Sequence, residues 1–284
     1  MAFDVSHPQI QDAVRRALEE DIGTGDITTF LTVSAETKAV GRMVARQDLT
    51  LAGIELLPLI FSSIAPHKCE IAIMHESGAH LKKGDAIATV TGPARALLTG
   101  ERTALNFVQR LSGVATLASA FAERMQGTGC RILDTRKTTP GLRRLEKQAA
   151  VAGGAVNYRH GLYDAVLIKN NHITTAGGVR AALEKTHNAG VPVEIEVRTR
   201  AELDEALANG ATHLLLDNLT PPDAREWIEH IRATNGKAIT IELSGGITLA
   251  NARAYAETGA DFLSSGAITH SAPAVDINFG LTLS

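Results

Sequence analysis

The sequence predicts an α/β protein with an N-terminal α+β part and a C-terminal part built on about six parallel strands. Up to about residue 110, strand-like alternation is flanked by helical segments. After Gly127, short apolar runs alternate with amphipathic segments, and their spacing of about 20–35 residues is typical of repeated βα units. About six such units are too few for an eightfold barrel but suit an incomplete, open one. A doubly wound sheet is the alternative.

The N-terminal part begins with an amphipathic helix. Ile10, Val14 and Leu18 recur at helical spacing, which places them on one face. Cys69 and Ile71 instead alternate with their neighbours, as in a strand with one buried side. In chain order we expect a helix over 7–20, a loop over 21–26, strands within 38–91 interrupted by a short helix over 55–61, and a helix over 94–126 broken at 112–113.

The C-terminal part contains six short apolar runs, each of which we expect to be a parallel strand. The runs are 132–133, 165–168, 193–197, 213–216, 238–241 and 261–263. Between the runs lie amphipathic segments that predict helices. These segments are 142–152, 176–188, 200–209, 221–233 and 248–258.

Composition excludes several classes of protein. Of the 284 residues 44% are apolar, enough for a folded core. A net charge of -3 argues against a nucleic-acid partner, which needs a basic face. Two distant cysteines cannot form a disulfide framework and fit a reducing cytoplasm. The first ten residues lack the apolar run of a signal peptide, and no run is long enough to cross a membrane. We therefore expect a cytoplasmic protein with no membrane partner.

Polar residues follow every predicted strand of the C-terminal part. In a parallel barrel these strand ends share one face, where such folds carry their active sites. The groups are Asp134–Lys137, Lys169–His172, the acids Glu194 and Glu196 within their strand, Asp217–Asn218, Glu242 with Ser244–Gly246, and Ser264–Gly266. The pattern predicts one shared site.

That predicted site contains cations and acids. The cations are Arg136, Lys137, Arg159 and Lys169, and arginine suits bidentate capture of carboxylates or phosphates. The acids Glu196 and Asp217 are oxygen ligands of the kind that hold Mg²⁺ beside substrate phosphates.

Glycines after the last two strands predict an anion site. Ser244-Gly245-Gly246 and Ser265-Gly266 allow backbone N–H groups to approach a phosphate. The sequence contains no nucleophile motif and no histidine pair with metal-ligand spacing. His172 and His270 remain as candidate site residues.

Several motifs together resemble the quinolinate phosphoribosyltransferase family over nearly the whole chain. The stretch Asp134-Thr-Arg-Lys-Thr-Thr-Pro-Gly-Leu142 is the most specific of them. The others are Glu101–Asn106, Gln109–Gly113, Gly161-Leu162, Leu167–His172, the Glu196 strand, Leu216–Asn218, Ser244–Gly246 and Gly266–His270.

The resemblance implies a fold and a reaction. It implies an N-terminal α/β sandwich domain over 1–112, joined by the C-terminal tail 271–284, and an incomplete α/β barrel over 113–270. The implied reaction transfers phosphoribosyl from phosphoribosyl pyrophosphate to quinolinate with decarboxylation, giving nicotinate mononucleotide in NAD biosynthesis. The implied assembly is a homodimer, or a larger homo-oligomer, in which each barrel is completed by the partner's N-terminal domain.

The resemblance also implies roles for individual residues. Arg46 and Arg102 would be supplied by the partner subunit. The four cations would hold quinolinate and pyrophosphate, with Lys137, Lys169, Glu196 and Asp217 as the catalytic set. Glu196 and Asp217 would hold the ribose hydroxyls and Mg²⁺, and Ser244, Gly245 and Gly266 would hold the 5′-phosphate. Gly246 and Ser265 join them as substrate-binding candidates from the glycine pattern alone.

Two residues depart from the family pattern. Tyr158 stands where the family usually has histidine, and Asn170 where it commonly has an acid. Tyr158 is expected to contact the substrate acid, with packing under its loop as the alternative. Three other functions remain open: the same reaction on another aromatic acid, a molybdenum-associated relative that usually breaks the Arg-Lys-Thr-Thr-Pro motif, or a catalytically inactive metabolite-binding protein.

Overall fold

The computed structural model describes residues 3–284, so the first two residues of the expected N-terminal domain lie outside it. The chain divides into two compact units. The first comprises 1–119, 138–154 and 268–284, and the second comprises 120–137 and 155–267. Residues 138–154 thus fold with the first unit, although they lie inside the stretch expected to form the barrel.

The first unit is built on an antiparallel sheet of four strands in the order β12-β1-β5-β3. Its strands are β1 (Lys38–Ala45), β3 (Glu70–Ile73), β5 (Ala86–Pro93) and β12 (Ile277–Leu283), and a separate pair is β2 (Leu49–Thr50) with β4 (His80–Leu81). The last strand of the chain, β12, pairs with β1 along its full length. The C-terminal tail therefore completes this sheet.

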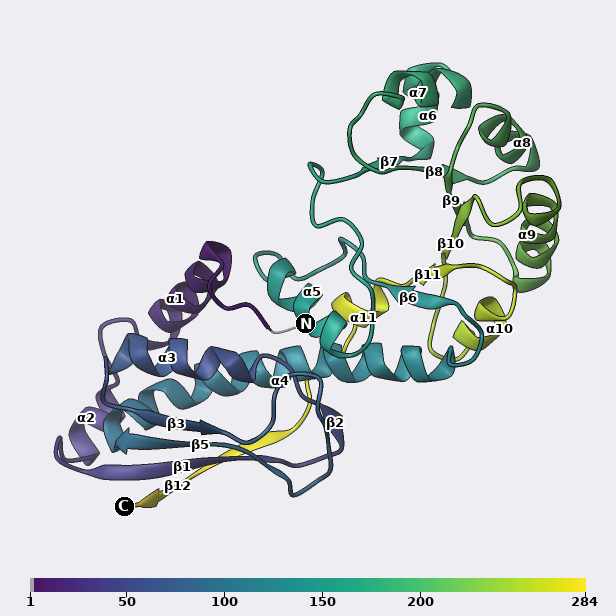
Figure 1. Ribbon diagram of the computed structural model, residues 1–284. Coiled ribbons are helices and arrows are strands. Elements are labelled where there is room, and N and C mark those ends of the chain that lie inside the picture. Colours follow the sequence, from purple (N-terminus) through teal and green to yellow (C-terminus); the bar gives the residue numbers. More distant parts are fainter. Residues whose placement is uncertain (1–2) are drawn as a thin grey trace. The chain divides into compact units, whose positions relative to one another are not determined.

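Helices cover one face of the four-stranded sheet, where Figure 1 shows α3 and α4. The helices of the first unit are α1 (Pro8–Ile22), α2 (Ile27–Thr32), the 3₁₀ turn η1 (Ile54–Leu56), α3 (Leu57–Ile64), most of α4 (Ala94–Arg124), α5 (Arg143–Ala152) and all but the first residue of α11 (Ala267–His270). Phe61, Met43 and Leu97 are fully buried between these layers. This α/β sandwich confirms the expected N-terminal fold.

The predicted break in the long helix is wrong, because α4 continues through residues 112 and 113. A side chain at Gly113 would clash with the backbone carbonyl of Pro273, and one at Gly153 with that of Ala115. The glycine at 113 therefore permits close packing of the C-terminal tail against an intact helix.

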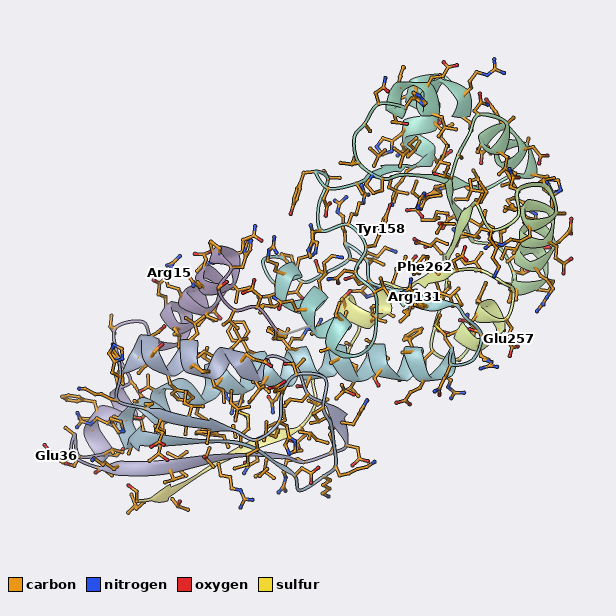
Figure 2. The ribbon with its side chains drawn as sticks, viewed as in Figure 1. Arg15, Glu36, Arg131, Tyr158, Glu257 and Phe262 are labelled. Atoms are coloured by element: carbon orange, nitrogen blue, oxygen red, sulfur yellow. The ribbon has the colours of Figure 1, made fainter. Side chains whose placement is uncertain are left out.

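The second unit contains six parallel strands in the order β6-β11-β10-β9-β8-β7. They are β6 (Arg131–Leu133), β7 (Val166–Ile168), β8 (Val193–Val197), β9 (His213–Asp217), β10 (Thr240–Ser244) and β11 (Phe262–Ser264). Because β6 and β7 are edges, the sheet is open, as predicted. Figure 2 labels Arg131 and Phe262 on two neighbouring strands; the guanidinium carbon lies 5.0 Å from the ring centre.

Helices follow the strands of the second unit and lie on the outer side of its sheet (Figure 1). They are α6 (Asn170–Ala176), α7 (Val179–Thr186), α8 (Arg200–Ala208), α9 (Pro221–Asn235) and α10 (Ala252–Ala256). Four of the five residues of the inner strand β8 are buried, whereas two of the three residues of the edge strand β7 are only half-buried. None of the helices formed by residues 3–284 combines the length and the apolar character of a membrane span.

Candidate active site

The C-terminal ends of the six parallel strands carry the polar residues of the second unit. Ser244 at the end of β10 is aligned with Asp217 at the end of β9, and Ser264 at the end of β11 with Leu133 at the end of β6. Parallel strands place these ends on one edge of the sheet. The predicted site residues at this edge are Arg136, Lys137, Lys169, Glu196, Asp217, Ser244, Gly245, Gly246, Ser265 and Gly266.

Glu196 and Asp217 are brought together by a single guanidinium. Arg198 Nη2 lies 2.8 Å from Glu196 Oε1, and its Nε lies 3.7 Å from Asp217 Oδ2. The two acidic side chains are only 8% and 14% exposed. The Glu196 contact is close enough for an ion pair but lacks the alignment of a hydrogen bond, so Oε1 is buried without a hydrogen-bond donor. Such an oxygen is suited to a cation.

The turn after β9 holds Asp217 in place. Asn218 Nδ2 donates to Asp217 Oδ2 at 2.6 Å, and its backbone N–H donates to the Ser244 carbonyl at 2.9 Å. Asn218 adopts a positive φ of 59°. Gly245 has a φ of 95°, and a side chain there would clash with the Asn218 amide. At Gly246, also with positive φ, the corresponding space is open.

Tyr158 faces buried acids rather than solvent. Its hydroxyl is buried, and its contact with Glu194 falls short of a well-formed hydrogen bond. Burial, then the Glu194 carboxylate, raise the pKa of Tyr158 far above its usual range. Its backbone N–H donates to the buried Asp134 carboxylate at 2.9 Å. Figure 2 shows Tyr158 close to the strands of the parallel sheet.

Glu194 and Glu242 form a buried acid pair beneath Tyr158. Each is 5% exposed, on β8 and β10. Burial raises the pKa of both carboxyls, and the charge of Glu194 raises that of Glu242 further. Two carboxylates in such surroundings retain a proton between them.

The loop after Tyr158 carries Arg159, whose Nη1 donates to the Ala165 carbonyl at 3.3 Å. Asp164 fixes the turn by accepting the backbone N–H groups of His160 and Gly161 at 2.7 and 3.0 Å. Leu162 in this turn is 76% exposed. The loop therefore presents Arg159 beside a tight, exposed turn.

Lys169 and His172 lie at the start of α6. His172 Nδ1 accepts the backbone N–H of Lys169 at 2.9 Å, so the imidazole caps the helix. Lys169 is exposed. The structure gives His172 a role in positioning the lysine backbone.

The remaining predicted residues, Arg46, Arg102 and His270, belong to the first unit. Arg46 follows β1, Arg102 lies on α4, and His270 ends α11. All three side chains are exposed. The His270 ring nitrogen Nδ1 lies 2.6 Å from the Ser271 hydroxyl.

The most specific motif is anchored within the first unit by Glu146, which is fully buried. Its carboxylate accepts the Thr139 N–H at 3.0 Å and the Thr139 hydroxyl at 2.7 Å, and pairs with Arg110 at 2.8 Å. The Arg110 guanidinium also donates to the carbonyls of Thr269 and Ala272. The Thr-Thr-Pro part of the motif is thus held by a structural ion pair.

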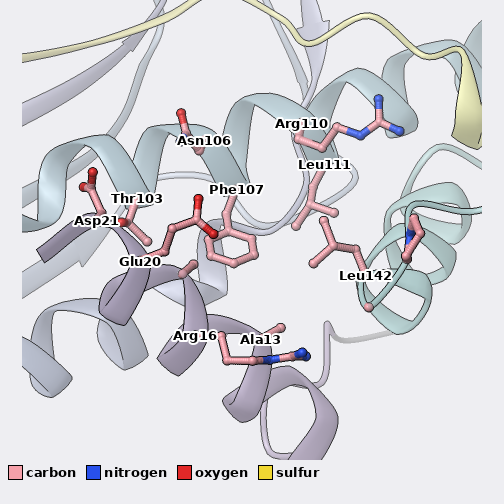
Figure 3. Close-up of a pocket in the computed structure, with 13 residues that line it drawn as sticks. Ala13, Arg16, Glu20, Asp21, Thr103, Asn106, Phe107, Arg110, Leu111 and Leu142 are labelled. Carbon is pink, nitrogen blue, oxygen red and sulfur yellow. The ribbon is translucent and has the colours of Figure 1, made fainter. Parts of the chain in front are cut away.

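A hollow of about 500 Å³ lies in the first unit (Figure 3). Arg16 and Glu20 of α1 face it, as do Asn106 and Arg110 of α4 and the turn ending at Leu142. Among residues 3–284, those that line it include none of the predicted site residues.

Sequence reasoning did not single out Arg198, and it grouped Asp134, Glu194 and Glu242 with the strand-end residues without giving them individual roles. An acid inside an apolar strand, such as Glu242 in Thr-Ile-Glu-Leu, is the signal that could have identified the buried pair. No comparable signal marks Arg198, which resembles any charged residue at the start of a helix.

Comparison with known proteins identifies relatives of the whole chain. Residues 26–112 match the N-terminal domain, and residues 114–280 the C-terminal domain, of quinolinate phosphoribosyl transferase. The chain is 40% identical to nicotinate-nucleotide pyrophosphorylase [carboxylating] of Mycobacterium leprae, covering 99% of this chain and 100% of the relative. It is 39% identical to a probable enzyme of the same name from Bacillus subtilis, covering 99% and 96%.

Solved structures agree with this relationship. The nicotinate-nucleotide pyrophosphorylase of Francisella tularensis superposes with a TM-score of 0.92 at 34% identity, covering 99% of this chain and 98% of that one. Because both domain models match in order and the relatives align over full length, this chain belongs to the quinolinate phosphoribosyl transferase family.

Proposed function

We propose that this protein transfers the phosphoribosyl group of phosphoribosyl pyrophosphate to quinolinate with decarboxylation, releasing nicotinate mononucleotide, pyrophosphate and carbon dioxide. The observation that carries the proposal is the pair Glu196 and Asp217, which meet at an edge of the parallel sheet that also carries Lys137 and Lys169. This reaction needs cationic side chains to bind two anionic substrates, and acidic side chains to stabilise the positive charge that develops on the sugar.

The cations bind and orient the substrates. Arg136 and Arg159 each hold one carboxylate of quinolinate, since a guanidinium matches a carboxylate bidentately. Lys137 and Lys169 stabilise the departing pyrophosphate as point charges. His172 keeps the Lys169 backbone in position through its 2.9 Å cap.

The acid pair acts on the ribose. Positive charge develops on the sugar as its bond to pyrophosphate breaks, and the carboxylates of Glu196 and Asp217 stabilise that charge. The pyridine nitrogen of quinolinate forms the new bond to the anomeric carbon and so becomes positively charged. That charge stabilises the electron pair left on C2 when the adjacent carboxylate leaves as carbon dioxide, and a proton then takes the place of the carboxylate. The 5′-phosphate is held at the ends of β10 and β11, by Ser244, Gly245, Gly246, Ser265 and Gly266.

The same two acids fit a magnesium ion. Glu196 Oε1 is buried without a hydrogen-bond donor. Residues 3–284 include no cluster of three acidic, histidine or cysteine ligands, and Mg²⁺ is often held by one or two carboxylates plus substrate phosphates. When bound there, Mg²⁺ would neutralise charge on the pyrophosphate.

The proposal includes the assembly and the location expected from the sequence. The protein works in the cytoplasm as a homodimer or larger homo-oligomer, with Arg46 and Arg102 of one subunit completing the site of its partner. Substrate binding falls to the cations and the strand-end turns, and not to His270 or Tyr158. Tyr158 faces the buried Glu194 instead.

The test is a turnover assay with phosphoribosyl pyrophosphate and Mg²⁺, supplying either quinolinate or nicotinate. We expect nicotinate mononucleotide and one carbon dioxide per turnover from quinolinate, and no product from nicotinate. Turnover of nicotinate alone would assign a different acceptor. A folded protein that binds quinolinate without turnover would instead be a metabolite-binding protein.

A further inference from the structure

Arg198 contacts both proposed metal ligands and has no place in the reaction described above. It follows β8 directly, and its guanidinium reaches Glu196 at 2.8 Å on the same segment and Asp217 at 3.7 Å on the neighbouring strand. The contact with Glu196 uses Oε1, the oxygen that lacks a hydrogen-bond donor. The guanidinium thus occupies the position that suits a bound cation.

The backbone of Arg198 is fixed while its side chain can move. Its N–H donates to Glu202 Oε2 at 2.8 Å, and Thr199 and Glu202 cap the start of α8 reciprocally. The Arg198 side chain is 47% exposed, in contrast to the two nearly buried acids. A long side chain on a fixed backbone can leave the acids for solvent by rotamer changes alone.

A guanidinium and a divalent ion cannot occupy one acid pair together, because like charges a few ångströms apart repel. We infer that Arg198 is a built-in counter-ion, which holds Glu196 and Asp217 in the unliganded protein and must leave when a divalent metal binds. The competition weakens binding of free metal, so that metal enters chiefly with the phosphate-bearing substrate. This inference rests on the proposed metal role of the acid pair.

Titration with Mn²⁺ alone tests the inference, with free Mn²⁺ followed by electron paramagnetic resonance and no substrate present. Arg198→Gln should bind Mn²⁺ about fivefold or more tightly than the wild type, since a unit charge close to a metal is removed from a partly screened site. Arg198→Lys, which keeps the charge, should stay closer to the wild type.

Arg200→Gln is the matched control, because it removes the same charge two residues further on. Arg200 pairs with Asp204 at 3.5 Å and not with the proposed metal ligands, so its affinity for Mn²⁺ should equal that of the wild type. Equal affinity in Arg198→Gln and Arg200→Gln would overturn the inference.

Two further measurements separate this inference from the proposed function. Asp217→Asn should weaken Mn²⁺ binding; if it does not, the acid pair is not the metal site and the inference fails with it. Wild-type turnover of quinolinate tests the reaction independently. Tighter Mn²⁺ binding by Arg198→Gln in a protein that does not turn over quinolinate would support the counter-ion and reject the proposed reaction.

Discussion

Three acids on the strands of the second unit have different surroundings and therefore different roles. Glu194 and Glu242 are buried together, and burial raises the pKa of both carboxyls. Glu196, on the same strand as Glu194, instead meets the Arg198 guanidinium at 2.8 Å. Residue type alone does not separate these roles, because burial dominates around Glu194 and Glu242 whereas a guanidinium faces Glu196.

Glu242→Gln should stabilise the protein at about pH 8 and change little at about pH 4.5. The raised pKa means that folded protein binds the Glu242 proton more tightly than the unfolded chain does. This tighter proton binding therefore stabilises the folded protein fully below the ordinary carboxyl pKa. The stabilisation is lost as the pH rises through the raised pKa of Glu242 in the folded protein. Melting temperatures at both pH values measure this. The exposed Glu257→Gln is the control, and an equal shift at both pH values would contradict the prediction.

Asp217→Asn should lower kcat/KM by about 100-fold, equivalent to roughly 2.7 kcal/mol of transition-state stabilisation, while leaving the fold intact. The amide has the same size as the carboxylate and can still contact Asn218, but the substitution removes one of the two negative charges that face Arg198. Steady-state kinetics against phosphoribosyl pyrophosphate, with circular dichroism as the check of folding, measure the effect. Wild-type kinetics in the variant, or in excess chelator, would remove Asp217 from the metal role.

At the scale of elements, α4 holds the C-terminal tail in the first unit. Gln109 Nε2 donates to the Ile277 carbonyl at 2.9 Å, and the Val275 N–H donates to the Gln109 carbonyl at 3.2 Å. The tail passes over Gly113 so closely that a Cβ atom would clash with Pro273. This contact places β12 beside β1.

Gly113→Ala should destabilise the protein by about 2–3 kcal/mol, although alanine favours a helix by about 1 kcal/mol over glycine. The clash is with backbone, which cannot turn aside as a side chain can. Gly100→Ala on the same helix is the comparison, because its new methyl group would meet only the side chains of Phe61 and Ile64 at 2.8 Å. Urea unfolding measures both variants, and a smaller loss for Gly113→Ala than for Gly100→Ala would contradict the proposed contact.

These elements also show what the sequence can predict. The hydrophobic pattern located all six parallel strands, because each is a short apolar run between helices. It failed at residues 112–113, where the glycine serves a contact with residues some 160 positions away in the chain. It also missed α6, whose seven polar-rich residues give little helical periodicity. Strand ends predicted the meeting of Glu196 and Asp217, whereas the reach of Arg198 depends on side-chain geometry that a pattern does not contain.

At the scale of the whole molecule, the proposed site residues fall into two sets. Arg46 and Arg102 belong to the first unit, whereas the cations, the acids and the phosphate-binding turns belong to the second. If a partner subunit supplies the first set, each active site needs intact residues from two chains. A chain without a partner subunit would then have no complete active site, so activity would depend on oligomerisation.

Mixing Arg102→Ala with Lys137→Ala protein should therefore restore activity that neither variant has alone. Random exchange in a dimer makes about half of the molecules mixed, and each mixed dimer has one intact site, so about a quarter of wild-type activity should return. The converse control mixes wild type with the double variant. Shared sites leave about a quarter of the activity of the same total protein, because mixed dimers have no intact site, whereas independent sites leave about half. Differently tagged chains first verify that subunits have exchanged, and the activity of each mixture then distinguishes shared from independent sites. Half of the activity in the control, with no recovery in the first mixture, would show that each chain works alone.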